Sequence, residues 1–402
     1  MRAIALKPES NFLPILLVIK VYTGFLMTNS LYSMGALNVL LVFIIWIAFF
    51  LCNVINSQNR IKEISLSFSI VCIFFVAVYL FDTDYSNKQI LYDLSLVYIF
   101  AALPIQDRLK TFNYFVNFGA ILLVFSIIEF ILYFGFGKGF ILATFDRGEN
   151  EKEEMWVLQG LFNYYIFDRN YIIVRFQSLF REPGYLGQSA GLVLLNYSRI
   201  PLKKTIVWLI AGIMSVSMFF YIFMLIIPPM FYFMRQKKHV ASNINIKYVI
   251  VFFLFLFISV HLIPQEVKET IYDRVEFFTE QGRDNRTTAS FNEDLLRMLN
   301  SEDALWGYGA TSFYKNGYAF GNSGIKADLY KNGIIEVVVV IVAFILLAIS
   351  FKTKFKLKIL ITLIFLMCYY NADIKYALYI YIPLLHILDQ VYLDNPIKIR
   401  KK

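Results

Sequence analysis

The stretch FNYFVNFGAILLVFSIIEFILYF, residues 112–134, decides the class of fold to which this chain belongs. Glu129 is its only charged residue, and aromatic and aliphatic side chains fill most of the rest. A helix that crosses a bilayer needs about 20 consecutive, mostly apolar residues. The stretch therefore predicts a transmembrane helix.

Similar apolar stretches recur along the chain and predict about 12 spans in all. The composition agrees, because 58% of the residues are hydrophobic, 17% are charged and the mean hydropathy is +0.60, values far from those of a soluble domain. We expect an all-α, polytopic transmembrane helix bundle. The predicted spans lie near residues 11–27, 37–54, 64–81, 89–103, 112–134, 183–197, 205–216, 218–234, 247–263, 331–351, 359–370 and 376–391.

Two long polar segments interrupt these spans and predict five parts. Residues 1–136 form N-terminal transmembrane helices, 137–181 a first large outer loop, and 182–263 central transmembrane helices. Residues 264–330 form a second large outer loop, and 331–402 the C-terminal transmembrane helices with a basic tail. Short helices are expected within the loops.

The positions of the basic residues predict the orientation. The formal net charge is +9, but the Lys and Arg residues gather in alternate short loops and the C-terminal tail, whereas the short loops on the other side offer only Lys88 and Lys375. Because Lys and Arg concentrate on the cytoplasmic side, we expect both termini in the cytoplasm and both large loops outside. This distribution favours a membrane topology over a nucleic-acid partner. The first apolar run shows no small-residue cleavage site and is expected to stay as an anchor.

Cysteines and histidines give no support for a disulfide framework, a metal or a cofactor. Cys52, Cys72 and Cys368 lie inside apolar runs, and His239, His261 and His386 are scattered. A metal centre needs ligands grouped at suitable spacing. We therefore predict no metal site and no cofactor.

The end of the first polar segment predicts an anion site. Residues 156–171 are aromatic and amphipathic and are expected to form a helix in the headgroup plane. Arg175 and Arg181 then precede Glu182 and Pro183. Proline favours the first position of a helix, so Glu182 is the expected cap. A helix N-terminus next to guanidinium groups can hold an anion, although a plain cap or a surface ion pair is the alternative.

The helix that follows Pro183 is rich in small residues, among them Gly184, Gly187 and Gly191. Small side chains allow another helix, or a ligand, to lie close to the backbone.

The second polar segment predicts two amphipathic helices and further basic residues. One helix, over residues 267–278, carries Arg274. Ser290 and Glu293 fit a capping box for another helix, which carries Arg297. Arg283 and Arg286 lie in the turn between the two helices, and Gly307 and Gly309 follow the second one and permit tight turning or close backbone approach. The alternative for each arginine is a surface ion pair of small energy.

Arginine binds two phosphate oxygens at once and keeps its charge. Arginines on two outer loops above apolar spans therefore suggest a ligand that is both anionic and membrane-bound, such as a lipid-linked pyrophosphate. Within the spans, Lys20, Asp93, Glu129 and Glu336 are expected to be structural, with Lys20 paired to Glu129, although a chain of essential charges would favour a transporter.

At Arg181-Glu182-Pro183-Gly184, and again at Arg297 followed by Trp306-Gly307-Tyr308-Gly309, the sequence resembles the O-antigen polymerase (Wzy) family, within the wider O-antigen ligase/polymerase-like membrane glycosyltransferases. The layout of spans and loops is also similar. An arginine–glycine spacing found in some members is not kept, since Gly307 and Gly309 fall on either side of the required position.

The resemblance implies a metal-independent membrane glycosyltransferase of the bacterial inner membrane. It would polymerise undecaprenyl-pyrophosphate-linked repeat units into O-antigen or a related surface polysaccharide. Arg181, Glu182 and Arg297 would be catalytic. Substrate-binding roles are implied for Arg175, Arg274, Arg283, Arg286, Gly307 and Gly309. The implied partners are the lipid-linked glycan donor and acceptor, membrane lipids, a chain-length regulator and a flippase.

Two other functions stay open. O-antigen ligases resemble the chain in layout but carry a histidine in the second large loop, and residues 264–330 contain none, which favours a polymerase. A lipid-linked oligosaccharide flippase or polysaccharide exporter predicts short outer loops, which the two long segments disfavour.

Overall fold

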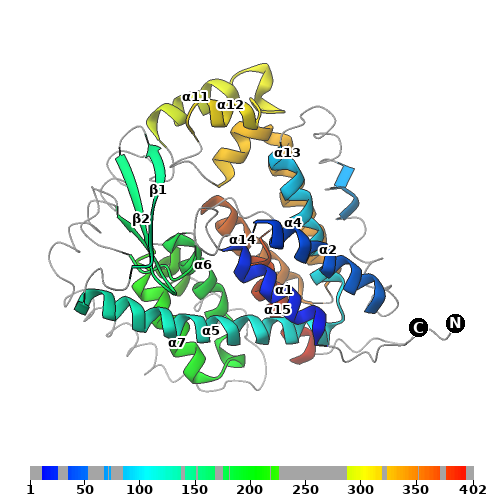
Figure 1. Cartoon of the computed structure of the whole chain (residues 1–402). Coiled ribbons are helices and arrows are strands. Elements are labelled where there is room, and N and C mark those ends of the chain that lie inside the picture. The colour runs from blue at the N-terminus through cyan, green and yellow to red at the C-terminus, as the bar shows by residue number, and fades with distance from the viewer. Residues whose placement is uncertain are drawn as a thin grey trace, which may run out of the picture.

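The computed structural model describes residues 11–25, 35–52, 68–70, 72–73, 85–136, 141–150, 153–167, 175–180, 182–217, 219–225, 288–318, 324–351, 353–371 and 377–394. Helices dominate this part of the chain (Figure 1). The larger helices are α1 (Phe12–Gly24), α2 (Gly35–Cys52), α4 (Tyr85–Ala102), α5 (Ile105–Phe136), α6 (Pro183–Leu194), α7 (Leu202–Met214), α11 (Ala289–Leu299), α13 (Ile325–Ser350), α14 (Phe355–Asn371) and α15 (Leu378–Asp394). Short helical elements are η2 (Tyr197–Arg199), η3 (Glu302–Ala304) and α12 (Ala310–Lys315).

The predicted membrane character is supported in part. Two described helices, Ile105–Phe136 and Ile325–Ser350, are long and apolar enough to cross a bilayer by length and composition. Four shorter apolar helices cover Phe12–Gly24, Leu37–Leu51, Tyr92–Ala102 and Leu378–Asp389. The mostly helical character is confirmed, although the described residues also contain three strands, and a bundle of about 12 spans is not confirmed.

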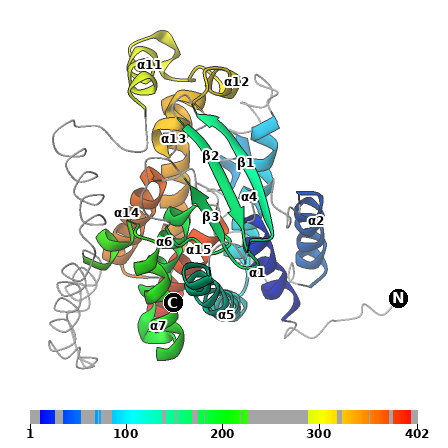
Figure 2. The same ribbon diagram turned by 60° about the vertical axis from the view of Figure 1, so that its left-hand side comes forward.

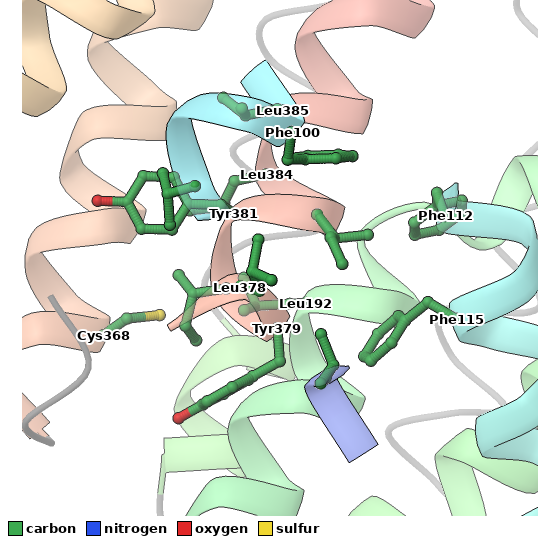
Figure 3. Close-up of a cluster of buried hydrophobic side chains, with 14 of the residues drawn as sticks. Phe100, Phe112, Phe115, Leu192, Cys368, Leu378, Tyr379, Tyr381, Leu384 and Leu385 are labelled. Atoms are coloured by element: carbon green, nitrogen blue, oxygen red, sulfur yellow. The ribbon is translucent and has the colours of Figure 1, made fainter. Parts of the chain in front are cut away.

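Helix α15 is the centre of the helical assembly. It contacts α4, α5, α6 and α14, and its consecutive residues Leu384 and Leu385 are both fully buried. A helix that is apolar on every side must be surrounded by other helices. Figure 3 shows this cluster, in which Phe112 of α5, Leu192 of α6 and Cys368 of α14 gather near the α15 side chains.

Close helix packing in the bundle depends on glycine. A Cβ on Gly119 of α5 would lie 2.2 Å from the Tyr22 hydroxyl of α1 and 2.3 Å from the Trp208 ring of α7. Tyr22 donates to the carbonyl of Phe115 at 2.9 Å, and the Trp208 indole donates to that of Val116 at 3.3 Å. Gly119 therefore lets two aromatic side chains cross α5 and reach its main chain.

The first polar segment contains a sheet where a helix was predicted. Strands β1 (Ala143–Asn150), β2 (Glu153–Gln159) and β3 (Tyr164–Phe167) form an antiparallel sheet in the order β1-β2-β3. Ala143 and Tyr164 both pair with Gln159. The expected helix over residues 156–171 is wrong for residues 156–167, and residues 168–171 lie outside the described part of the chain. The strands were not recognised because consecutive side chains such as Val157 and Leu158 are both buried and hide the alternation of a strand.

Glu129 fixes this sheet to α5. Its carboxylate accepts from the backbone N–H groups of Leu161 at 2.7 Å and Phe162 at 2.6 Å, in the turn between β2 and β3. A Cβ on Gly160 would lie 1.8 Å from the carboxylate, so a larger residue there would displace the Glu129 side chain from the turn. The predicted Lys20–Glu129 pair is thus wrong, because the Glu129 carboxylate is hydrogen-bonded to the turn.

Lys20 instead lies 3.9 Å from Asp93 of α4, so its expected structural role holds with a different partner. A second pair, Arg108 with Asp389, joins α5 to α15. The guanidinium donates to both carboxylate oxygens, at 2.7 and 2.6 Å, and both side chains are 3% exposed. Arg108, expected in a short cytoplasmic loop, is therefore a buried residue.

The second polar segment lies against the first part of α13. Helices α11 and α12 both contact α13. Figures 1 and 2 show α11 and α12 together at one end of the molecule, and β1 and β2 rise from beside α5 toward that end. The described parts of the two polar segments are thus on the same side of α5.

Helix α11 is confirmed, with a different cap from the one expected. Thr288, and not Ser290, is the N-cap, and its hydroxyl accepts from the Phe291 N–H at 3.3 Å. The apolar face of α11 buries Phe291 and Met298 among Phe313 and Tyr330. The expected helix over residues 267–278 lies outside the described residues.

Candidate functional site

The start of α6 follows the sequence prediction. Pro183 is at the first position, and Glu182 is the N-cap, in an extended conformation with φ −148° and ψ 150°. The Glu182 side chain makes no capping hydrogen bond. Its carboxylate is therefore not used to close the helix. Arg181 lies outside the described residues.

Small residues of α6 are used for packing. A Cβ on Gly187 would lie 2.4 Å from the Ser217 Cβ, and one on Gly191 would lie 3.1 Å from the Phe223 ring. The close approach that the sequence predicted is thus made by the chain that follows α7.

Arg175 joins the first polar segment to a break after α7. Its Nε donates to the Ser215 carbonyl at 3.2 Å and its Nη2 to the Val216 carbonyl at 3.1 Å. Val216 has φ 47°, a left-handed conformation that is unusual for a β-branched residue. The carbonyl end of a helix carries partial negative charge. The guanidinium therefore stabilises a strained helix end close to α6.

Gln177 is a polar residue that sequence reasoning missed. It is 1% exposed, and neither atom of its side-chain amide has a hydrogen-bond partner within the described part of the chain. Its main-chain carbonyl accepts from the Phe180 N–H at 3.1 Å, which forms a turn between Arg175 and α6. A buried polar group without a partner costs about 1–3 kcal/mol. Gln177 is therefore a candidate for contact with a ligand.

The turn that carries Gln177 is held from two sides. Ser178, with φ 54°, has its hydroxyl 2.7 Å from that of Ser126 on α5, and its carbonyl accepts from the Tyr164 N–H of β3 at 3.0 Å. On the other side, the Phe176 N–H donates to the Met214 carbonyl at 3.4 Å. The segment from Arg175 to Phe180 is thus fixed between the sheet and the end of α7.

Aromatic side chains pack beside the same turn. Phe180 lies 4.1 Å from Phe25, the residue that follows α1, and Phe25 lies 5.1 Å from Tyr379 of α15, measured between ring centroids. All three are buried. This contact sets the position of α6 relative to the helical core.

Tyr165 of β3 is buried beside Glu129. Burial, and to a smaller extent the charge of Glu129, raises the pKa of the Tyr165 phenol well above its usual value. The phenol is therefore neutral at physiological pH, and a phenolate base is excluded at this position.

Arg297 is placed apart from the start of α6. Its side chain is 73% exposed and lies 3.1 Å from the Asp294 carboxylate on the same helix. Figures 1 and 2 both separate α11 from α6, and no contact between described residues joins Arg297 to Arg175 or Glu182. Arg274, Arg283 and Arg286 lie outside the described residues, so a common site for all the predicted arginines stays a prediction.

Gly307 and Gly309 meet the backbone of α13. Their φ values are 77° and 85°, and a Cβ on Gly307 would lie 2.6 Å from the Gly333 nitrogen. The N–H groups of Tyr308 and Gly309 donate to the carbonyls of Tyr330 and Lys331 at 2.8 and 3.0 Å. The close backbone approach expected here is made within the protein, and the substrate-binding role of the two glycines stays a prediction.

Comparison with known proteins gives no further assignment, because no family model, no curated protein and no solved structure matches the chain. The candidate site therefore consists of Arg175, Gln177 and Glu182, which lie within eight residues of the chain leading into α6, with Arg181 next to Glu182 in sequence. It combines a positive group, a buried amide and a carboxylate outside the helix cap. Such a set can bind an anion and accept a proton from a neighbouring hydroxyl.

Proposed function

We propose that the chain is a multi-pass glycosyltransferase of the bacterial inner membrane that polymerises undecaprenyl-pyrophosphate-linked repeat units into O-antigen or a related surface polysaccharide. Three features support the proposal: the apolar helices, the two polar segments on one side of α5, and the resemblance at Arg181-Glu182-Pro183-Gly184. The observation that carries it is the buried amide of Gln177, unpartnered among the described residues, in the short segment that leads from Arg175 to Glu182, the N-cap of α6.

In the proposed reaction a hydroxyl of the acceptor repeat attacks the anomeric carbon of the donor glycan. The bond from that carbon to the pyrophosphate oxygen breaks, and the lipid pyrophosphate leaves with the electron pair. Arg175 and Arg181 stabilise the negative charge that grows on the leaving group, where fixed donors lower the barrier most. Glu182 takes the proton of the attacking hydroxyl.

Gln177 has the chemistry to orient the donor. Its amide offers two donors and one acceptor, which suits a phosphate oxygen on one side and a sugar hydroxyl on the other. A buried amide discriminates strongly against ligands that leave it unpaired. We propose that it selects a phosphate attached to a sugar.

The second polar segment has a separate part in the proposal. Arg297 on α11, with Arg274, Arg283 and Arg286 earlier in the same segment, would bind the glycan, or the pyrophosphate of the second lipid-linked repeat, away from the start of α6. Because Arg297 is exposed and paired with Asp294, this role requires its side chain to leave Asp294 when substrate arrives. A surface pair of this type holds by less than about 1 kcal/mol.

The test is the gel profile of surface polysaccharide in a strain that lacks the chain and carries single variants on a plasmid. We expect Arg181→Ala and Glu182→Gln to abolish long polymer and to leave single repeats attached to the surface. Glu182→Gln is informative because the side chain does not cap α6. Glu302→Gln, which removes an exposed carboxylate from η3, is the matched control and keeps the polymer.

The outcomes distinguish the proposal from its alternatives. Full-length polymer in both variants contradicts the site. Loss of all attached glycan, single repeats included, indicates a ligase, and accumulation of lipid-linked repeats in the cytoplasmic leaflet indicates a flippase or exporter. Protein abundance is measured in the same membranes, because Arg175→Ala would leave two carbonyls without a donor and destabilise the break after α7.

A further inference from the structure

Two large apolar side chains lie exposed in the link between η3 and α12. Leu305 is 51% exposed and Trp306 is 57% exposed. Their backbone is nevertheless fixed, because the Trp306 N–H donates to the Asp303 carbonyl at 3.1 Å and the Ile335 N–H donates to the Leu305 carbonyl at 3.3 Å. The link therefore holds Leu305 and Trp306 outward from a rigid turn.

The link meets α13 where the polar part of that helix ends. A Cβ on Gly333 would lie 2.1 Å from the Leu305 carbonyl oxygen and 2.5 Å from the Trp306 nitrogen. Between Ile325 and Asn332 polar and apolar residues alternate irregularly, whereas an uninterrupted apolar run begins after Glu336. Gly333 itself has φ 74° and ψ −174° and kinks the helix. The link thus lies at the outer edge of the apolar part of α13.

That part of α13 has one exposed apolar stripe. Its members recur at helical spacing and share exposures between 37% and 50%: Ile334, Val338, Val342, Ile345 and Ile349. From Gly333 to Ser350 a helix rises about 26 Å at 1.5 Å per residue, close to the roughly 30 Å thickness of the hydrocarbon core. In a bilayer crossed by this part of α13, the Leu305–Trp306 link would lie at the depth of the headgroup boundary.

We infer that Leu305 and Trp306 anchor the second polar segment to the outer surface of the bilayer. Tryptophan concentrates at this boundary because its ring is apolar and its indole N–H is polar. The main chain of the exposed pair contacts Gly333 and Ile335, next to Ile334, the first member of the stripe. The inference requires α13 to cross a bilayer and is independent of glycan transfer.

The anchor has a mechanical consequence for the rest of the segment. The same link connects through Gly307 and Gly309 to α12, and through η3 to α11. Fixing its depth sets the height of both short helices above the membrane. Arg297 is thereby kept near the level of lipid headgroups.

The test is depth-dependent fluorescence quenching of the full chain in phosphatidylcholine nanodiscs. Acyl chains carry bromine either next to the headgroup or near the terminal methyl. The chain has four tryptophans, and the contribution of Trp306 is the difference between wild type and Trp306→Phe, checked against Trp306→Tyr. Trp46→Phe gives the corresponding difference for a residue in the middle of α2, with 36% exposure.

We expect the Trp306 contribution to lose more intensity with shallow bromine than with deep bromine, and the Trp46 contribution to show the reverse order. Loss of the Trp306 signal to aqueous iodide, with no loss to either lipid, would overturn the anchor. Protection of Trp306 from iodide by soluble polysaccharide, again without lipid quenching, would also overturn it and identify a sugar-stacking surface.

Discussion

Replacement of Gly333 by alanine tests the contact between the outer helices and α13. Gly333 has φ 74° and ψ −174°, a region that only glycine enters readily. An added Cβ would lie 2.1 Å from the carbonyl oxygen of Leu305 and 2.5 Å from the nitrogen of Trp306. Both are main-chain atoms and cannot turn aside as a side chain would. The substitution must therefore change the helix kink, the contact, or both.

The cost of this change has two parts. The unfavourable backbone conformation contributes about 1–3 kcal/mol, and moving a packed main chain contributes a further ~1–3 kcal/mol. Gly317 is a matched control, because its φ is 73° and an added Cβ would meet nothing within 4 Å. Gly317→Ala is expected to cost only the conformational part, about 1–2 kcal/mol.

Hydrogen–deuterium exchange measures the difference at the contact itself. The N–H groups of Tyr308 and Gly309 are bonded to carbonyls before the kink, so their exchange reports local opening. An excess of about 2.8 kcal/mol in Gly333→Ala corresponds to roughly 100-fold faster exchange. Equal exchange rates in Gly333→Ala and Gly317→Ala would refute the backbone contact.

Three further substitutions test other contacts. Arg108→Met leaves Asp389 buried without its partner and removes a donor from the Ala101 and Leu103 carbonyls, so it is expected to lower the free energy of unfolding by about 3–5 kcal/mol. Adding Asp389→Leu should restore the part of the melting temperature that is lost to the unpaired carboxylate, and no recovery at all would contradict the ion pair. Glu129→Gln replaces one of the two carboxylate acceptors of the turn after β2 and is expected to lower the local stability of the sheet by about 1–3 kcal/mol. Faster proteolysis within residues 141–167 measures this loss, and unchanged cleavage would argue against the contact between Glu129 and the turn. Arg297→Ala breaks only the exposed pair with Asp294 and should change the free energy of unfolding by less than about 1 kcal/mol, so a large shift in melting temperature would show that Arg297 is not at the surface.

Helices were predictable where their determinants lie in the helix itself. Pro183 fixed the start of α6, and the apolar spacing along α11 fixed its buried face. The cap of α11 was harder, because Thr288 and Ser290 both offer a hydroxyl within three residues and either can accept from the first turn. Sequence alone does not decide which one takes the extended conformation.

The sheet could not be predicted from periodicity. Val157 and Leu158 on β2, and Tyr164 and Tyr165 on β3, are consecutive and all buried. A strand covered on both faces has no alternation of polar and apolar residues, so periodicity alone does not distinguish its sequence from that of a buried helix segment.

Several side chains of the site bind main-chain groups, and such partners cannot be recognised from residue types in the sequence. Arg175 was a candidate, but it binds the carbonyls of Ser215 and Val216, which any residues at those positions would provide. Glu129 likewise binds backbone N–H groups, and Lys20 pairs with Asp93 instead. Gln177 had no pattern to mark it, because its burial arises from the turn between β3 and α6.

The attachment of the sheet to α5 also affects how the protein can diversify. The Glu129 carboxylate binds main-chain N–H groups of the turn after β2, and the Leu161 side chain at that turn is 51% exposed. Substitutions at Leu161 can therefore accumulate without weakening the contact between the sheet and α5, whereas the residue types at positions 160 and 129 depend on each other. The hairpin is thus free to acquire a new outer face, and with it new molecular preferences, during evolution.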